Sequence, residues 1–273
     1  MMVPAADPRA AESLLAFWAE AGVDASLSDA PLDKLAEGVA RLKARQQAPT
    51  AAPAPRPGPA AKAGPDVSSA VADARRLASE AQDLTQLAAA IAAFEGCGLR
   101  YEGARQAVFS RGNPQAPLVI VGEGPGADED AQGAPFVGRA GKLLDKMIAA
   151  AGLTDRVFIT NTVFWRPPGN RTPTAAEQMV CAPFLDRTIQ LVNPRMLMLA
   201  GGASAKSVLK REEGILSLRG RWFEWKSADE TLALPALPTL HPAFLLRQPA
   251  AKKKAWSDLL TLTERLDRPD RPA

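Results

Sequence analysis

The sequence has few of the residues that build metal sites and disulfide frameworks. Its 273 residues include two cysteines, one histidine and one tyrosine. There is no basic start followed by an apolar run, as in a signal peptide, and no apolar run near the length of a membrane span. Together with the low cysteine count, these absences predict a soluble intracellular protein of the cytoplasm, with no membrane partner.

Composition supports a real core but says little about partners. The hydrophobic content of 47% and the length are enough for one sizeable domain plus an appendage. The net charge is +3 and the pI is near 9.0, a mild preference for anionic partners. Residues 1–45 predict a helical arm, the Ala/Pro-rich residues 46–65 predict a disordered linker, and residues 66–273 form the main domain.

Apolar spacing in the main domain alternates between helix and strand patterns. Helices are expected over 67–94, with a break at the capping residue Asp83, and from Thr174 to 191, where Glu177 completes a capping box. The other expected elements are strands at 107–110, 118–121, 156–161, 195–200, 222–225 and 236–240, and helices at 140–151, 203–209 and 251–266. This order predicts an α/β fold, a three-layer α/β/α sandwich with a short, mostly parallel central sheet.

A glycine-rich segment follows the strand at 118–121. Six glycines and two prolines between Gly122 and Gly141 predict a loop, which ends in the helix at 140–151. Such a loop lets a ligand approach bare backbone amides, and the helix N-terminus favours negative charge. The carboxylates of the loop would repel a phosphate unless a metal or a nascent cation lies among them. A simple phosphate cradle is therefore disfavoured.

Three of the expected strands end in polar residues. Glu123 follows the strand at 118–121, Asn161 closes the strand at 156–161, and His241 follows the last strand. Because sites in such folds gather at the carboxyl ends of the strands, we expect these three side chains to converge.

Three segments resemble the family 4 uracil-DNA glycosylases. They read GEGPGADEDAQGAPFVGRAGKLLD, ITNTVFWRPPGNRTPT and HPAFLLRQP, and the similarity covers Phe94 to Leu266. The resemblance implies that residues 66–273 are a catalytic domain with the uracil-DNA glycosylase-like sandwich. It implies an enzyme that hydrolyses the N-glycosidic bond of uracil flipped out of DNA, which starts base excision repair. The expected partner is uracil-containing DNA, and we expect a monomer.

The residue types fit this chemistry. His241, the only histidine, can donate a hydrogen bond to uracil O2 as negative charge forms there. The Asn161 amide can accept from uracil N3–H and donate to O4, a pattern that cytosine reverses. Phe136 would stack on the flipped base.

The resemblance points to Glu123, and with it Glu129, as the groups that position water or stabilise the oxocarbenium ion. Asp128 and Asp130 are interpreted as solvated loop charges. Where some related families have a water-activating aspartate, this sequence has Gly124, which we interpret as leaving backbone room for the substrate.

For DNA, Leu245 or Leu246 could wedge into the gap left by the base. Arg247, Arg171 and the lysines at 252–254 could hold phosphates.

The sequence departs from the family at the iron–sulfur cluster. Most family 4 enzymes hold a [4Fe–4S] cluster with four cysteines, and the matching positions here are Phe94, Cys97, Trp165 and Cys181. Two thiolates cannot supply that ligation, so we predict no cluster and no other cofactor or metal. We expect Phe94 and Trp165 to fill the volume by apolar burial, with Cys97 and Cys181 as neighbouring reduced thiols.

Three alternatives stay open. A broader glycosylase would also take xanthine or hypoxanthine. A damage-binding homologue would have lost catalysis, although Glu123, Asn161 and His241 together argue against this. A phosphate hydrolase on the glycine loop is disfavoured because no Lys-Ser/Thr pair follows the loop and no His/Asp metal set is present.

Overall fold

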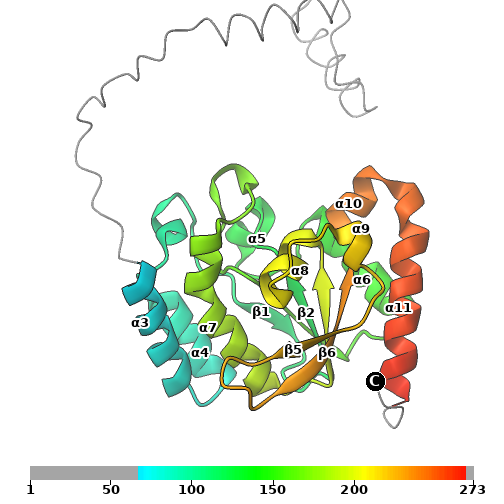
Figure 1. Ribbon diagram of the computed structural model, residues 1–273. Coiled ribbons are helices and arrows are strands. Elements are labelled where there is room, and N and C mark those ends of the chain that lie inside the picture. Colours follow the sequence, from blue (N-terminus) through cyan, green and yellow to red (C-terminus); the bar gives the residue numbers. More distant parts are fainter. Residues whose placement is uncertain (1–66, 269–273) are drawn as a thin grey trace, which may run out of the picture. The chain divides into compact units, whose positions relative to one another are not determined.

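A six-stranded sheet forms the centre of the part of the chain that the structure describes, residues 67–268 of a computed structural model. Its order is β1-β3-β2-β4-β6-β5. Figure 1 shows the sheet with the helices around it. The strands are β1 (Ser110–Gly112), β2 (Leu118–Gly122), β3 (Val157–Asn161), β4 (Met196–Ala200), β5 (Phe223–Lys226) and β6 (Ala233–Thr239). Strands β3, β2, β4 and β6 are parallel, and β1 and β5 pair antiparallel at the edges. The predicted short, mostly parallel sheet is confirmed.

The apolar run of β2 is explained by burial on both faces. Leu118 and Ile120 face one apolar cluster, while Val119 and Val121 face another, because successive side chains of a strand point to opposite sides. A continuous aliphatic run is therefore what this inner strand requires.

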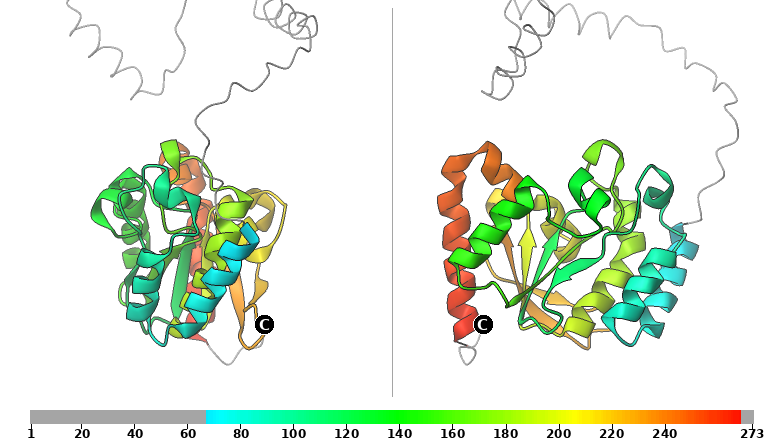
Figure 2. Two further views of the ribbon diagram at one scale, coloured as in Figure 1. Left: turned by 90° about the vertical axis from the view of Figure 1, so that its left-hand side faces the viewer. Right: turned by 180° about the vertical axis from the view of Figure 1, so that it is seen from behind.

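Helices cover both faces, as the sandwich prediction requires. On one face, α6 (Arg139–Ala150) and α11 (Lys252–Asp267) pack their apolar sides against the sheet. On the other face lie α7 (Ala175–Val192), α8 (Gly202–Leu209) and α9 (Ile215–Leu218). Figure 2 shows the two helical layers with the sheet between them. The three-layer α/β/α architecture is confirmed.

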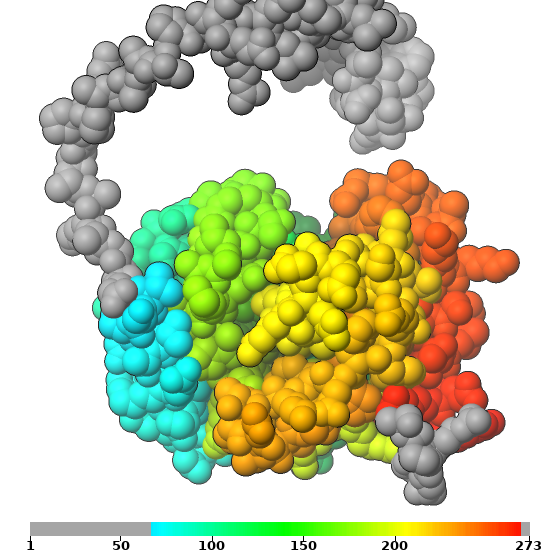
Figure 3. All heavy atoms as spheres, viewed as in Figure 1, coloured from blue at the N-terminus to red at the C-terminus, as the bar shows by residue number. Residues whose placement is uncertain are grey.

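A further pair of helices packs outside α7. They are α3 (Val67–Glu80), which presents Ala70, Ala74 and Ala78, and α4 (Leu84–Ala93). These alanines allow a close approach, and the space-filling view shows α3, in cyan, directly against α7 (Figure 3). The predicted break is confirmed, because Asp83 caps α4 by accepting the Gln86 N–H at 2.8 Å. The predicted capping box of Thr174 and Glu177 at the start of α7 is also confirmed.

Two predictions of local structure were wrong. The strand expected at 107–110 begins only at Ser110, because Val108 is buried and its N–H donates to the Phe164 carbonyl at 2.7 Å, outside the sheet. The glycine-rich segment is not all loop, since it contains the short helix α5 (Ala127–Gln132). The remaining short elements are α10 (Pro242–Arg247), η1 (Gly98–Tyr101), η2 (Pro168–Asn170) and η3 (Pro249–Ala251).

The arm predicted at 1–45 and the linker predicted at 46–65 lie outside the described residues. Within residues 67–268, none of the helices combines the length and the apolar character that crossing a bilayer requires.

Candidate active site

The structure brings the three polar strand ends to one edge of the sheet. Glu123 follows β2 directly, Asn161 is the last residue of β3, and His241 comes shortly after β6. Strands β2 and β3 are in register so that Gly122 lies opposite Asn161. The three side chains come from segments far apart in the sequence and share this edge because the strands are parallel.

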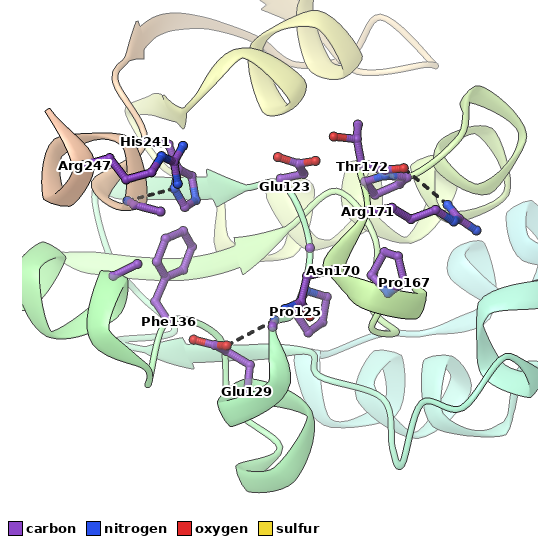
Figure 4. A pocket seen from close by; sticks show the side chains of 15 residues that line it. Glu123, Pro125, Glu129, Phe136, Pro167, Asn170, Arg171, Thr172, His241 and Arg247 are labelled. Atoms are coloured by element: carbon purple, nitrogen blue, oxygen red, sulfur yellow. Dashed lines mark hydrogen bonds between the residues drawn. The ribbon is translucent and has the colours of Figure 1, made fainter. Parts of the chain in front are cut away.

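A pocket of about 500 Å³ opens at this edge (Figure 4). Its walls come from the segment after β2, the segment around η2 and the start of α10. The lining residues are Glu123, Gly124, Pro125, Gly126, Glu129, Phe136, Ala140, Pro167, Asn170, Arg171, Thr172, Pro173, His241, Ala243 and Arg247.

Gly122 marks the point where the amide and the aromatic ring of the site meet. A β-carbon on Gly122 would lie 2.4 Å from Asn161 Oδ1 and 2.5 Å from an edge carbon of the Phe136 ring. No side chain could occupy that position without displacing both. Glycine at 122 therefore allows the Asn161 amide and the Phe136 ring to approach each other.

The Asn161 side chain is buried without a partner. It is 1% exposed, and neither Nδ2 nor Oδ1 has a hydrogen bond within the described part of the chain. A buried polar group left unsatisfied costs about 1–3 kcal/mol, so such groups are rare unless a ligand completes them. The orphaned amide calls for a ligand that offers one donor and one acceptor side by side.

The His241 imidazole is held neutral and in one tautomer. Its Nδ1 accepts the Ala243 N–H at 3.1 Å, at the start of α10, so Nδ1 carries no proton and Nε2 carries it. Burial, and to a smaller extent the charge of Arg247, lower the pKa of His241 from 6.5 to about 4, against a smaller opposing effect of Glu129. At neutral pH the ring is therefore a neutral Nε2–H donor.

Phe136 lies beside this imidazole. The ring centroids of Phe136 and His241 are 5.6 Å apart at 31°, and both residues line the pocket (Figure 4). The phenylalanine has a left-handed backbone, with φ of 55°. Its ring thus offers an apolar face next to the histidine donor.

The carboxylates of Glu123 and Glu129 differ in their hydrogen-bond partners. The Glu123 side chain lines the pocket, and its carboxylate makes no hydrogen bond or ion pair with another described residue. The carboxylate of Glu129 accepts three backbone N–H groups, those of Gly126, Val137 and Gly138, at 3.0–3.1 Å. Glu129 therefore fastens the two ends of the segment that carries Phe136, which leaves Glu123 as the free carboxylate of the pocket.

The neighbouring residues Asp128 and Asp130 likewise differ, one being exposed and the other buried and hydrogen-bonded. Asp128 is exposed, as expected, but the interpretation of Asp130 as a solvated charge was wrong. Asp130 is 2% exposed, and its Oδ1 accepts the Arg105 N–H at 2.8 Å. Its role is to anchor α5. Gly124 lines the pocket, and a β-carbon there would lie 2.9 Å from the Val163 side chain.

The residues expected to face DNA lie in different environments. Leu245 is fully buried in an apolar cluster with residues of α6 and α11, whereas Leu246 is 39% exposed. Arg247 is exposed and lines the pocket, and the lysines at 252–254 are exposed as well. Arg171 lies on the opposite wall and is paired with Glu177 at 2.6 Å and with Glu102 at 3.2 Å. These hydrogen bonds raise the pKa of Arg171, so it stays charged, and its charge is already paired with two carboxylates of the fold.

Away from the pocket, the four positions of the implied cluster lie together in the apolar core between α7 and the α3–α4 pair. Cys97 and Cys181 are buried with their sulfur atoms 4.0 Å apart. Phe94 and Trp165 are 4% and 2% exposed, with ring centroids 6.4 Å apart. Within residues 67–268 no three His, Cys, Asp or Glu side chains are grouped to hold a metal. Two rings and two thiols do not fit four-cysteine ligation.

Sequence reasoning named only Arg171 on the wall of the pocket around η2. It missed Asn170 and Thr172, which also line that wall, and Arg166 Nε donates to Asn170 Oδ1 at 2.7 Å. The Pro-Pro-Gly-Asn-Arg run at 167–171 predicts a turn, but not which way its side chains point.

Comparison with known proteins agrees with this geometry. The sequence model of one family, described as the uracil DNA glycosylase superfamily, matches residues 109–260. Similar curated proteins include a type-4 uracil-DNA glycosylase of Sulfurisphaera tokodaii, 40% identical over 58% of this chain and 74% of that protein. A protein of the same description from Thermotoga maritima is 42% identical over 51% and 71%, and one from Pyrobaculum aerophilum is 37% identical over 65% and 91%.

Proposed function

Because the chain belongs to the uracil DNA glycosylase superfamily, we propose that it hydrolyses the N-glycosidic bond of uracil flipped out of DNA, the first step of base excision repair. The observation that carries the proposal is the unpartnered Asn161 amide, which lies beside the Phe136 ring that lines the pocket. The proposed catalytic domain spans residues 66–273.

Asn161 would recognise the base. Its Oδ1 would accept from uracil N3–H and its Nδ2 would donate to O4, while Phe136 stacks on the pyrimidine face. Cytosine has an acceptor at N3 and a donor at its 4-position, so it would leave both atoms of the amide unsatisfied. Unpaired groups in a site built for hydrogen bonding reject an analogue by 10⁴–10⁵-fold in favourable cases.

His241 would stabilise the departing base. As the C1′–N1 bond breaks, its electron pair passes to uracil and negative charge reaches O2. The neutral Nε2–H of His241 would donate to that oxygen. Because the ring already has the required tautomer, no proton needs to move before the bond breaks.

Glu123 would act at the sugar. Cleavage leaves positive charge on the deoxyribose, which the free carboxylate can stabilise while it orients a water molecule. Water oxygen then bonds to C1′ and gives up one proton, which balances the anionic base. We assign Glu129 to holding the pocket loop in place, because its carboxylate is occupied by three backbone N–H groups.

On the DNA side, we assign the wedge to Leu246 rather than Leu245, because only Leu246 is exposed. Arg247 and the lysines at 252–254 would contact phosphates. A phosphate contact by Arg171 would have to compete with its two carboxylate partners. We propose that the enzyme works without a [4Fe–4S] cluster, as a cytoplasmic monomer. Metal analysis for iron tests the absence of the cluster, and light scattering for mass tests the monomer.

The test of function is a cleavage assay. Untagged protein in EDTA is incubated with oligonucleotides that contain uracil, xanthine or hypoxanthine, and alkali then breaks the abasic sites. We expect cleavage at uracil. Asn161→Ala and His241→Ala should each lower the single-turnover rate by about 10²–10³-fold, the cost of losing one well-placed donor.

Asn113→Ala is the matched control for the amide. Asn113 is a half-buried asparagine whose Nδ2 donates to the Asp155 carbonyl, near the start of β3 and away from the pocket. It should retain the normal rate. Near-normal rates in both site variants would refute the assignment, and equal cleavage of all three bases would establish the broader glycosylase instead.

A further inference from the structure

The backbone of Phe136 is held in a conformation that phenylalanine seldom adopts alone. Its φ of 55° lies in the left-handed region, which disfavours residues with a bulky side chain. The carbonyl of Phe136 also lies against α6 so closely that a β-carbon on Gly141 would be 1.7 Å from its oxygen. Such a conformation persists only when surrounding groups fix it.

One side chain outside the pocket supplies these fixing contacts. Arg111 Nε donates to the Pro135 carbonyl at 2.7 Å, and Arg111 Nη2 donates to the Phe136 carbonyl at 3.1 Å. The same Nη2 pairs with Asp145 Oδ1 at 2.6 Å. Arg111, at edge strand β1, thus bonds the carbonyl of the strained Phe136 and the carbonyl of the residue before it. Through Asp145 it also bonds helix α6.

The segment is therefore gripped from both sides by opposite charges. Glu129 takes the N–H groups of Val137 and Gly138, and Arg111 takes the carbonyls of Pro135 and Phe136. The planar fork of a guanidinium can reach two adjacent carbonyls and a carboxylate together, which the single point charge of a lysine cannot do.

We propose that Arg111, oriented by Asp145, is a positioning residue that holds the Phe136 ring in the position where the flipped base stacks on it. This inference rests on the proposed function, because it assigns Phe136 to the base. Arg111 does not line the pocket, so it acts only through Phe136. An exposed ion pair by itself contributes little, and the argument therefore depends on the two carbonyl contacts.

The structure supplies a matched control for the charge. Arg156 forms an ion pair with Asp267 at 2.7 Å, with side-chain exposures of 36% and 57% against 28% and 50% for Arg111 and Asp145. Arg156 precedes β3, at the end of the strand opposite to Asn161, and its side chain bonds Asp267 but no residue of the pocket segment among residues 67–268. Arg156→Met thus removes a comparable ion pair and nothing near the pocket.

The experiment is a double-mutant cycle on kcat/KM for uracil in DNA. We expect Arg111→Met to lower kcat/KM by about 10-fold to 10²-fold, the scale of a 1 Å misplacement, and Arg156→Met to leave it unchanged. In a Phe136→Ala background, Arg111→Met should cost less than about twofold, because the ring through which it acts is gone. An equal loss in both backgrounds would overturn the proposal.

A second readout does not depend on activity. Hydrogen exchange should be faster at the amides of Val137 and Gly138 in Arg111→Met than in the wild type or Arg156→Met. If Arg111→Met does not fold, Arg111→Lys takes its place, with the same direction expected. An inactive wild type would refute the proposed function. Unchanged hydrogen exchange at Val137 and Gly138 in Arg111→Met would refute this inference alone.

Discussion

The single histidine allows the electrostatics of the pocket to be measured directly. His241 is the only imidazole in the chain, so an untagged, ¹⁵N-labelled protein gives one set of imidazole signals. Because burial lowers the pKa of His241 to about 4, we expect these signals to stay unchanged from pH 8 to pH 5 and to titrate only near pH 4. At neutral pH the ¹⁵N shifts should show a protonated Nε2 and an unprotonated Nδ1.

The lowered pKa of His241 also predicts how stability depends on pH. The unfolded chain binds a proton at His241 near pH 6.5, whereas the folded protein binds it only near pH 4. The free energy of unfolding therefore falls as pH drops below 6.5, and this loss is complete below pH 4. At about 1.4 kcal/mol per pH unit, the loss reaches at most about 3 kcal/mol, an upper figure because part of the ring faces the pocket.

Comparison with His241→Gln isolates this contribution. Other titrating groups, such as Asp186, whose pKa burial raises to about 6, affect both proteins equally and cancel in the difference. Urea unfolding at pH 7, 5.5 and 4 should therefore show the wild type losing up to about 3 kcal/mol relative to the variant. An imidazole that titrates near 6.5, or a difference that does not change with pH, would refute the proposed neutral donor.

Three further predictions concern the loop, the DNA face and the core. Gly141→Ala should lower both stability and activity, because its β-carbon would collide with the Phe136 backbone. This collision outweighs the preference of helices for alanine over glycine, about 1 kcal/mol. Gly214→Ala, with open space around it, should keep both stability and activity in the same unfolding and cleavage assays. Leu246→Ala should lower kcat/KM on duplex more than on single-stranded uracil DNA, since only a duplex has a gap to fill, and equal losses would remove the wedge. Trp165→Ala should cost about 3–5 kcal/mol in urea unfolding, with no iron in metal analysis before or after the change.

Features set by local sequence were predictable. The caps at Asp83 and Thr174 use side chains that bond within three residues along the chain, so neighbouring letters contain the whole interaction. The parallel sheet followed from aliphatic runs that alternate with helical spacing. Once the strands were parallel, the edge shared by Glu123, Asn161 and His241 followed from topology.

Features set by distant contacts were not predictable. Asp130 is buried because it accepts an N–H from Arg105, and Arg171 is neutralised by Glu102 across 69 residues of sequence. Leu245 and Leu246 are the same residue type, and the packing of α10 against its neighbours, mainly α6, decides which one is buried. Arg111 lacks any local signal, since its partners are two loop carbonyls and a helix carboxylate that sequence spacing does not bring together.

The aromatic joint in the outer layer has a consequence for how this domain is made. Phe94, Phe164, Trp165 and Phe184 contact one another through ring centroids 5.1–6.4 Å apart, and they link α7 to the layer outside it. Contacts between aromatic rings need no metal, so neither a chelator nor a shortage of iron can remove them. On the proposal that the domain holds no [4Fe–4S] cluster, this part of the domain would assemble without any supply of iron.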